Sequence, residues 1–196
     1  MRVKICGITN LEDALDAIAA GASALGFVFY KPSPRYISVE EALTIVDALP
    51  PFVQTVGLFV NENEAVINEV CSKAKMQLAQ IIDDEEKLDY TQIKPKTIRV
   101  LRAKTPEDIV SFKDQYLLVD AFVPSFGGEG KRVALEWFKG KDCSKMILAG
   151  GLEASNVHEL KGLNFFALDV SSGVEAYKGK KDKDKMRAFI KAAHEL

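Results

Sequence analysis

Two side chains that could exchange protons stand at the ends of separate apolar runs in this 196-residue chain. Cys6 closes the run at residues 3–6 and is followed at once by Gly7 and a helix start. Asp120 closes the run at residues 116–120, ahead of a glycine-rich segment. A thiol and a carboxyl at two strand ends could act as a general base and a general acid. The alternative for Cys6 is an inert, buried apolar side chain, which is the commonest role of a free cysteine.

Two further segments carry small residues that allow peptide N–H groups to approach a phosphate. Gly150 and Gly151 follow one apolar run, and Ser172 and Gly173 follow the end of the next. Either pair taken alone is explained as well by a simple turn. Together they favour a phosphate site. Asp169 lies at the carboxyl end of the second of these runs, residues 165–170.

Arg35 lies in a proline-stiffened segment, KPSPRY at residues 31–36, which follows another apolar run. A guanidinium held there could bind a substrate carboxylate through two hydrogen bonds. The competing interpretation is a solvated surface arginine, because arginine is mostly exposed in folded proteins. The paired prolines favour the binding role.

These side chains depend for their positions on a regular alternation of short apolar runs and amphipathic helical patterns. The runs predict strands at residues 3–6, 25–29, 53–60, 76–82, 97–101, 116–120, 146–149 and 165–170. Helices are expected after the caps Asn10 and Asn61, from Ser38 to Pro50, over residues 85–90, after Thr105, over residues 135–138 and from Asp182. Eight strand–helix units in succession predict α/β structure, a compact (β/α)8 TIM barrel in a single domain, residues 1–196.

A doubly wound open sheet is the rival architecture, and it would need a G-x-G-x-x-G motif after its first strand. The chain reads CGIT there, at residues 6–9. In a barrel, active sites form at the carboxyl ends of the strands. Cys6, Asp120, Asp169 and the two pairs of small residues all lie at or after strand ends, so we expect them at one mouth of the barrel.

The composition excludes several classes of function. A formal net charge of −2 leaves no electrostatic footprint for nucleic acid or an anionic membrane. The apolar runs are too short to span a bilayer and no signal-peptide profile is present, so we expect a cytoplasmic protein without membrane contact. Three cysteines and two histidines form no metal-binding or disulfide pattern, so we expect no metal. The outward helix positions allow a monomer or a homodimer.

A series of short motifs runs through the chain in a fixed order. They are KICGIT at residues 4–9, GFVFY at 26–30, SPRY at 33–36, VGLFVN at 56–61, LAGGL at 148–152, NV at 156–157, DVSSGVE at 169–175 and GKKD at 179–182. In this order the motifs closely resemble those of phosphoribosylanthranilate isomerases, the (β/α)8 enzymes of tryptophan biosynthesis. The matching segments extend from one end of the chain to the other, and the ordered set is far more specific than any member.

The resemblance implies a role for each candidate residue. Cys6 would be the general base, Asp120 the general acid, Arg35 the anchor for the anthranilate carboxylate and Asp169 a substrate-orienting group. The phosphate would be bound by the loops that contain Gly150, Gly151, Ser172 and Gly173. The expected partner is a small phosphoribosyl substrate.

The implied reaction is an Amadori rearrangement, which needs an acid at the furanose ring oxygen and a base at C2′. The iminium that forms is itself the electron sink, so we expect no cofactor. Near neutral pH the acid must stay protonated and the base must be ionised. We therefore expect burial and the substrate's negative charges to raise the pKa of Asp120, and a cationic or N–H-rich strand end to lower the pKa of Cys6.

Two segments depart from the family pattern. The usual Gln-Leu-His-Gly after the fourth strand is matched here to QLAQ at residues 77–80, which removes a polar group near the mouth. The usual Gly-Gly-Thr-Gly after the sixth strand reads GGEG at residues 127–130, which adds a negative charge. The glycines make the loop at residues 121–132 the expected lid.

Two other functions remain open. One is a barrel isomerase that acts on the aminoaldose of histidine biosynthesis, but the family it would resemble uses aspartate where this chain has Cys6. The other is a barrel that has lost catalysis and only binds phosphosugars. The joint presence of Cys6, Arg35 and Asp120 argues against that second alternative.

Overall fold

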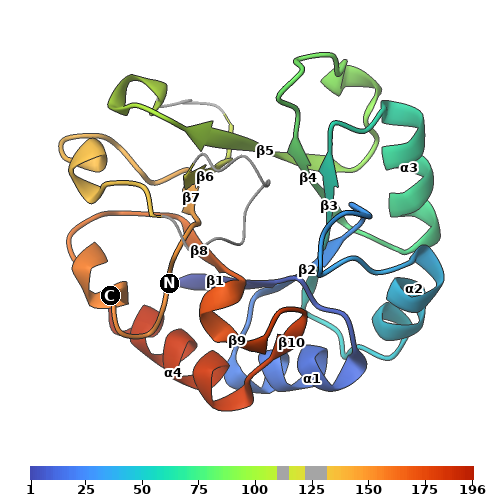
Figure 1. Cartoon of the computed structure of the whole chain (residues 1–196), viewed down its shortest axis with the longest axis horizontal. Helices are drawn as coiled ribbons and strands as arrows, with labels where there is room; N and C mark the ends of the chain where they lie inside the picture. The colour runs from blue at the N-terminus through green and yellow to red at the C-terminus, as the bar shows by residue number, and fades with distance from the viewer. Residues whose placement is uncertain (110–114, 122–131) are drawn as a thin grey trace.

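The computed structural model describes residues 1–109, 115–121 and 132–196, and within these ranges the strands close into a parallel barrel (Figure 1). The barrel strands are β1 (Arg2–Cys6), β2 (Ala24–Val28), β3 (Gln54–Val60), β4 (Leu78–Ile82), β5 (Lys96–Ala103), β6 (Leu117–Ala121), β7 (Met146–Leu148) and β8 (Ala167–Val170). Each strand pairs with the next, and β8 returns to pair with β1. The expected (β/α)8 barrel is confirmed, and the open sheet is wrong because no edge is left between β8 and β1.

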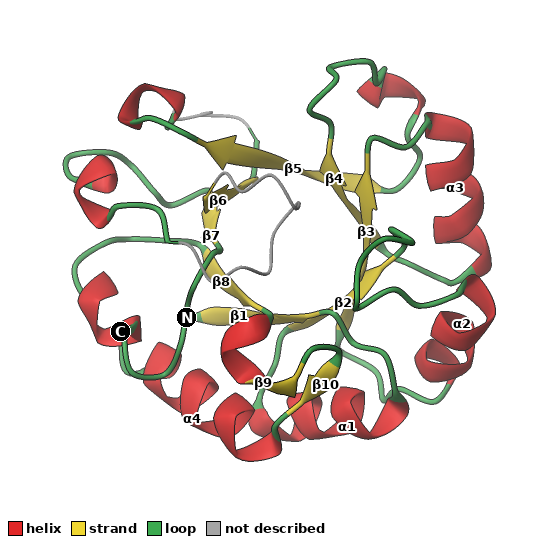
Figure 2. Ribbon diagram, viewed as in Figure 1, coloured by secondary structure: helices red, strands yellow, loops and turns green. Residues whose placement is uncertain are grey.

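Helices surround the barrel on its outer side (Figure 2). The α-helices of the described ranges are α1 (Leu11–Ala20), α2 (Val39–Asp47), α3 (Glu64–Lys73) and α4 (Lys183–His194). Their ends follow local chemistry that the sequence predicted. Asn10 accepts a hydrogen bond from the backbone of Asp13 and begins α1, and Gly21, at φ 104°, ends it. Ser38 and Glu41 form the expected capping box of α2.

Two expected helix ends are wrong. Asn63, not Asn61, caps α3, because its side chain accepts the backbone N–H of Val66. Asn61 instead extends the pairing of β3, since its N–H donates to the carbonyl oxygen of Ile82 at 2.8 Å. Helix α2 ends at Asp47, ahead of the expected end at Pro50.

Within the described ranges, the connections that follow β4, β5, β6 and β7 each contain a single 3₁₀ turn, and another such turn follows β8 ahead of α4. They are η1 (Tyr90–Gln92), η2 (Pro106–Asp108), η3 (Leu135–Phe138), η4 (Val157–Leu160) and η5 (Ser172–Val174). The helix expected at residues 85–90 is therefore wrong, and the turns at η2 and η3 are shorter than α-helices would be.

Alternation along each strand sends one set of side chains toward the helices and the other toward the barrel axis. A cluster on the axis is apolar and comprises Val56, Ile98, Leu118, Ile147, Ala149 and Ala167. Lys4, Gln80 and Asp169 also lie on barrel strands, and they are buried polar side chains. Burial of charge is costly unless it is compensated, so these residues single out part of the interior for function.

A two-stranded hairpin that the sequence did not predict follows β8. It consists of β9 (Glu175–Tyr177) and β10 (Lys180–Lys181) and lies beside α1 (Figure 1). The Thr9 hydroxyl donates to the carbonyl oxygen of Gly179 at 2.6 Å, and Lys180 Nζ donates to Asp13 Oδ1 at 2.6 Å. These bonds hold the hairpin against the segment that follows β1.

No helix in the described ranges is long and apolar enough to cross a lipid bilayer.

Candidate active site

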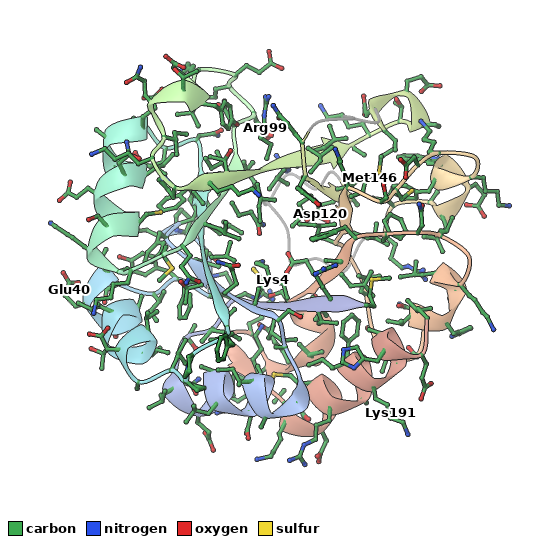
Figure 3. All side chains as sticks on the ribbon, turned by 180° about the vertical axis from the view of Figure 1, so that it is seen from behind. Lys4, Glu40, Arg99, Asp120, Met146 and Lys191 are labelled. Carbon is green, nitrogen blue, oxygen red and sulfur yellow. The ribbon has the colours of Figure 1, made fainter. Side chains whose placement is uncertain are left out.

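Lys4 and Cys6 are two residues apart in β1 and therefore project to the same side of the strand. Lys4 points toward the centre of the barrel, whereas Glu40 on a helix points outward (Figure 3). Gly26 of β2 lies opposite Cys6, and a Cβ there would stand 2.9 Å from Cys6 Sγ and 3.0 Å from Lys4 Nζ. The absent side chain of Gly26 thus makes the space in which the thiol and the ammonium meet.

Lys4 also joins this thiol to the last strand of the barrel. Its Nζ donates to Asp169 Oδ1 at 2.8 Å, and both side chains are buried. Burial by itself would lower the pKa of Lys4, but the charges of Asp169 and Cys6 outweigh it and raise that pKa. Cys6 and Asp169 are residues predicted from the sequence, whereas Lys4 was not among them. The signal was available, since a lysine inside an apolar strand at alternate spacing to Cys6 must share its face.

Asp120 lies near the end of β6, opposite Arg102 of β5. Figure 3 shows its side chain directed into the barrel, on the same side as Lys4. Burial raises the pKa of Asp120 from 3.8 to about 6, and repulsion from Asp169 adds to that effect. The backbone N–H of Ala121 donates to its Oδ1 at 2.8 Å and acts in the opposite direction. The expected direction is confirmed, and a carboxyl with this pKa can donate a proton near neutral pH.

The pKa of Cys6 departs from the expectation. Burial raises the pKa of its thiol, and the cations Lys4 and Lys181 offset only part of that increase. The predicted lowering of this pKa is therefore wrong in direction. Desolvation destabilises the thiolate more than the two neighbouring cations stabilise it. The expected positive charge is nevertheless present as Lys4 and Lys181, so a thiolate formed at this position has opposite charge beside it.

Arg35 is buried rather than solvated, so the surface alternative is wrong. Its Nε and Nη2 donate to the two carboxylate oxygens of Glu175, each at 2.8 Å. Lys181 Nζ donates to Glu175 Oε1 at 2.9 Å. Neither partner was predicted from the sequence, because Glu175 and Lys181 lie in the unpredicted hairpin.

The two loops expected to bind phosphate are in direct contact. Gly150 and Gly151 adopt φ values of 88° and 58°, which only glycine takes up without strain. A Cβ on Gly173 would lie 1.9 Å from the carbonyl oxygen of Leu152, so the loop after β8 packs on the loop after β7 only without a side chain there. Ser172 precedes this contact in η5. The geometry brings together the small residues that the sequence singled out, and their phosphate role stays a prediction.

Comparison with known proteins identifies the family. Residues 3–192 match the family model described as N-(5'phosphoribosyl)anthranilate (PRA) isomerase. The chain belongs to this family. A curated relative named N-(5'-phosphoribosyl)anthranilate isomerase, from a Nitratiruptor species, is 61% identical over 193 residues, which cover 98% of each chain.

Solved structures of the isomerase family share the whole fold. One is a phosphoribosyl anthranilate isomerase in complex with reduced 1-(o-carboxyphenylamino)-1-deoxyribulose 5-phosphate, with a TM-score of 0.81, 37% identity and full coverage of both chains. Another shows mutually generated monomers of the dimeric isomerase from Thermotoga maritima, with a TM-score of 0.83, 36% identity and full coverage of both chains.

One departure from the isomerase pattern was misplaced. Gln77 precedes β4 and the QLAQ segment runs into its first half, so it does not follow the strand at the mouth of the barrel. Ile82 ends the strand there. Gln80 is buried within β4, and its Oε1 is the buried side-chain oxygen without a hydrogen-bond partner among the described residues. The Gln80 side chain therefore places a polar group inside the barrel, within β4 and not at the mouth where a polar group was thought to be missing.

The remaining cysteines fit the inert role expected for them. Burial raises the pKa of Cys71, in α3, to about 12, and Cys143 is also buried. Cys71 differs from Cys6 because burial alone shifts its pKa, whereas the charges of Lys4 and Lys181 also act on Cys6. No group of three metal-binding side chains occurs within the described ranges. Of the lid expected at residues 121–132, residues 122–131, with Glu129, lie outside the described residues.

Proposed function

We propose that this chain, as one catalytic domain over residues 1–196, converts N-(5-phosphoribosyl)anthranilate into 1-(2-carboxyphenylamino)-1-deoxyribulose 5-phosphate in tryptophan biosynthesis, in the cytoplasm. The observation that carries the proposal is that β1 and β6 of one barrel carry a thiol that faces Lys4 and Lys181 and a carboxyl, Asp120, whose pKa is raised to about 6. An Amadori rearrangement requires a general acid and a general base, and two strands of the barrel would supply them here. The substrate itself supplies the electron sink, so the reaction uses no cofactor.

Asp120 acts first in this mechanism. Its carboxyl proton moves to the furanose ring oxygen, the bond between that oxygen and C1′ breaks, and the anilino nitrogen supplies the electron pair that forms the iminium. The thiolate of Cys6 then removes the proton from C2′, and those electrons form the enolamine. Tautomerisation of the enolamine gives the ketose. Lys4 and Lys181 stabilise the thiolate that the second step consumes.

The remaining residues orient the substrate. Arg35 binds the anthranilate carboxylate, and Asp169, held by Lys4, accepts hydrogen bonds from the sugar hydroxyls. The phosphate is bound by the loops that contain Gly150, Gly151, Ser172 and Gly173. This assignment is supported by the contact between the two loops at Gly173. As a partner, a second copy of the chain is compatible with the family, because the related Thermotoga maritima enzyme is dimeric.

The test follows the loss of anthranilate-type fluorescence when freshly generated phosphoribosylanthranilate is supplied. We expect Cys6→Ser and Asp120→Asn each to reduce turnover by about 10² to 10⁴. Cys71→Ser is the matched control, since Cys71 lies in α3 without a lysine partner in the described residues, and it should keep full activity. A folded wild-type chain that binds phosphate without turnover would support the non-catalytic barrel instead.

A further inference from the structure

Three buried charges form a network between the Arg35 segment and the hairpin that follows β8. Glu175 is its centre, because its carboxylate accepts two hydrogen bonds from Arg35 and one from Lys181. All three side chains are buried. Two cations around one carboxylate leave an excess positive charge, which would favour a bound anion at this place.

The geometry of the guanidinium decides which edge remains for a ligand. Arginine has five N–H donors, and Glu175 uses one on Nε and one on Nη2. The second fork, formed by Nη1 and the other N–H of Nη2, has no hydrogen-bond partner among the residues that the structure describes. A planar carboxylate fits such a fork through two parallel bonds.

The aliphatic part of the Arg35 side chain is also closely packed. Gly7, at φ 78°, has no side chain, and a Cβ there would lie 2.5 Å from Arg35 Cδ. The carbon chain of Arg35 therefore lies over the backbone of the glycine that directly follows Cys6. Hairpin residue Gly179 makes a similar close approach, since a Cβ there would stand 3.0 Å from the carbonyl oxygen of Pro34. The Arg35 segment is thus held between the end of β1 and the hairpin.

We propose that Glu175 is a positioning residue that fixes the free fork of Arg35 for the carboxylate of the substrate's aromatic ring. Through this role it sets the preference for a carboxylated over an uncarboxylated N-aryl aminoaldose phosphate. Lys181 completes the arrangement by sharing Glu175 Oε1. The inference rests on the proposed function, because it concerns the same substrate.

The experiment compares two substrates, phosphoribosylanthranilate and phosphoribosylaniline, which lacks the carboxylate. We expect Glu175→Gln to lower the ratio of the two kcat/KM values by about 10- to 100-fold, because one charged partner of a buried pair is lost. The change should fall on the KM for phosphoribosylanthranilate, while kcat/KM for phosphoribosylaniline stays near the wild-type value. Arg35→Met should abolish the preference entirely.

A double-mutant cycle separates positioning from a general loss of structure. If Glu175 acts through Arg35, Glu175→Gln causes no further change in the ratio in the Arg35→Met background. Lys180→Met is the matched control, because Lys180 lies in the same hairpin and pairs with Glu12 and Asp13 instead. It should leave the ratio unchanged. Should Glu175→Gln fail to fold, Glu175→Asp keeps the charge, withdraws it by one methylene and is expected to lower the ratio partially.

The outcomes distinguish the two proposals. An unchanged ratio in folded Glu175→Gln or Glu175→Asp overturns the positioning role, as does an additive loss in the double mutant. A wild-type chain that turns over neither substrate overturns the proposed function, whatever the state of Glu175.

Discussion

Cys6 and Asp120 show how burial can act against a proposed general base and in favour of a proposed general acid. Burial raises the pKa of Asp120 to about 6, which keeps an acid available. The same burial raises the pKa of Cys6, which works against a base. Lys4 is the cation that does most to offset this rise, so the supply of thiolate depends on it.

The role of Lys4 can be measured by titration of the Cys6 thiol. In a Cys71→Ser, Cys143→Ser background, where Cys6 is the sole thiol, Lys4→Met should raise the pKa of Cys6 further, because the cation beside Sγ is lost. Ultraviolet absorbance of the thiolate reports this pKa directly. We expect kcat/KM at neutral pH to fall by about tenfold or more. Lys4→Arg keeps the charge and should restore part of the loss, whereas an identical thiol titration in Lys4→Met would refute the role.

The pH dependence of activity follows from the same two groups. Below about pH 6 Asp120 is protonated and the thiolate fraction grows with pH, so kcat/KM should rise. Above about pH 6 the loss of protonated Asp120 cancels the gain in thiolate, and kcat/KM should level off until the raised thiol pKa is reached. A pH–rate profile of the wild type checks this. A steady tenfold rise per pH unit through pH 8 would contradict the acid role of Asp120.

At the scale of elements, the sequence predicted what depends on local pattern and missed what depends on tertiary contact. The strands followed from apolar runs, and the ends of α1 followed from Asn10 and Gly21. The hairpin β9–β10 has few apolar positions, and it is held by bonds to residues far away in the chain, such as Thr9. The role of Glu175 could not be recognised from the sequence for that reason, because its partner Arg35 is 140 positions away.

The contact between the loops after β7 and β8 gives the prediction at this scale. Gly173→Ala would place a Cβ 1.9 Å from the carbonyl oxygen of Leu152 and must force the two loops apart. We expect the affinity for inorganic phosphate to fall at least tenfold, measured by calorimetry. Gly140→Ala is the control, because a Cβ there meets nothing within 4 Å but φ is 74°. It should cost about 1–2 kcal/mol of stability and leave phosphate affinity unchanged. Equal affinities in the two variants would exclude the loop contact as a requirement for binding.

For the molecule as a whole, the polar groups in the barrel interior lower the stability of the fold and are also the groups proposed to act on the substrate. The apolar interior around Leu118 stabilises the fold, whereas the buried Lys4 and Asp169 and the half-buried Asp120 lose contact with water at a cost in free energy. Lys4 and Asp169 compensate each other through their ion pair. At Asp120 the desolvation of the carboxylate outweighs the favourable interactions with its neighbours, and its pKa is therefore raised. Its ionised form consequently lowers the stability of the folded barrel.

The sign of this effect can be worked out for Asp120. In the unfolded chain it ionises near its usual 3.8, but in the folded barrel only near 6, so the folded state holds more protons between these values. Stability from this group therefore falls as pH rises from about 4 to about 6 and stays low above it. Asp120→Asn cannot ionise, and at pH 8 it should unfold with a free energy about 1–3 kcal/mol higher than the wild type.

Urea unfolding at pH 4 and pH 8 tests this trade-off between stability and activity. The gap between Asp120→Asn and the wild type should be present at pH 8 and nearly absent at pH 4, while turnover is lost at both. Asp142→Asn is a control of opposite sign, because hydrogen bonds from Ser144 and Asn164 hold the pKa of Asp142 below its usual value. That variant should be less stable than the wild type at pH 8. A gap of the same size at both pH values would mean that Asp120 destabilises through packing and not through its charge.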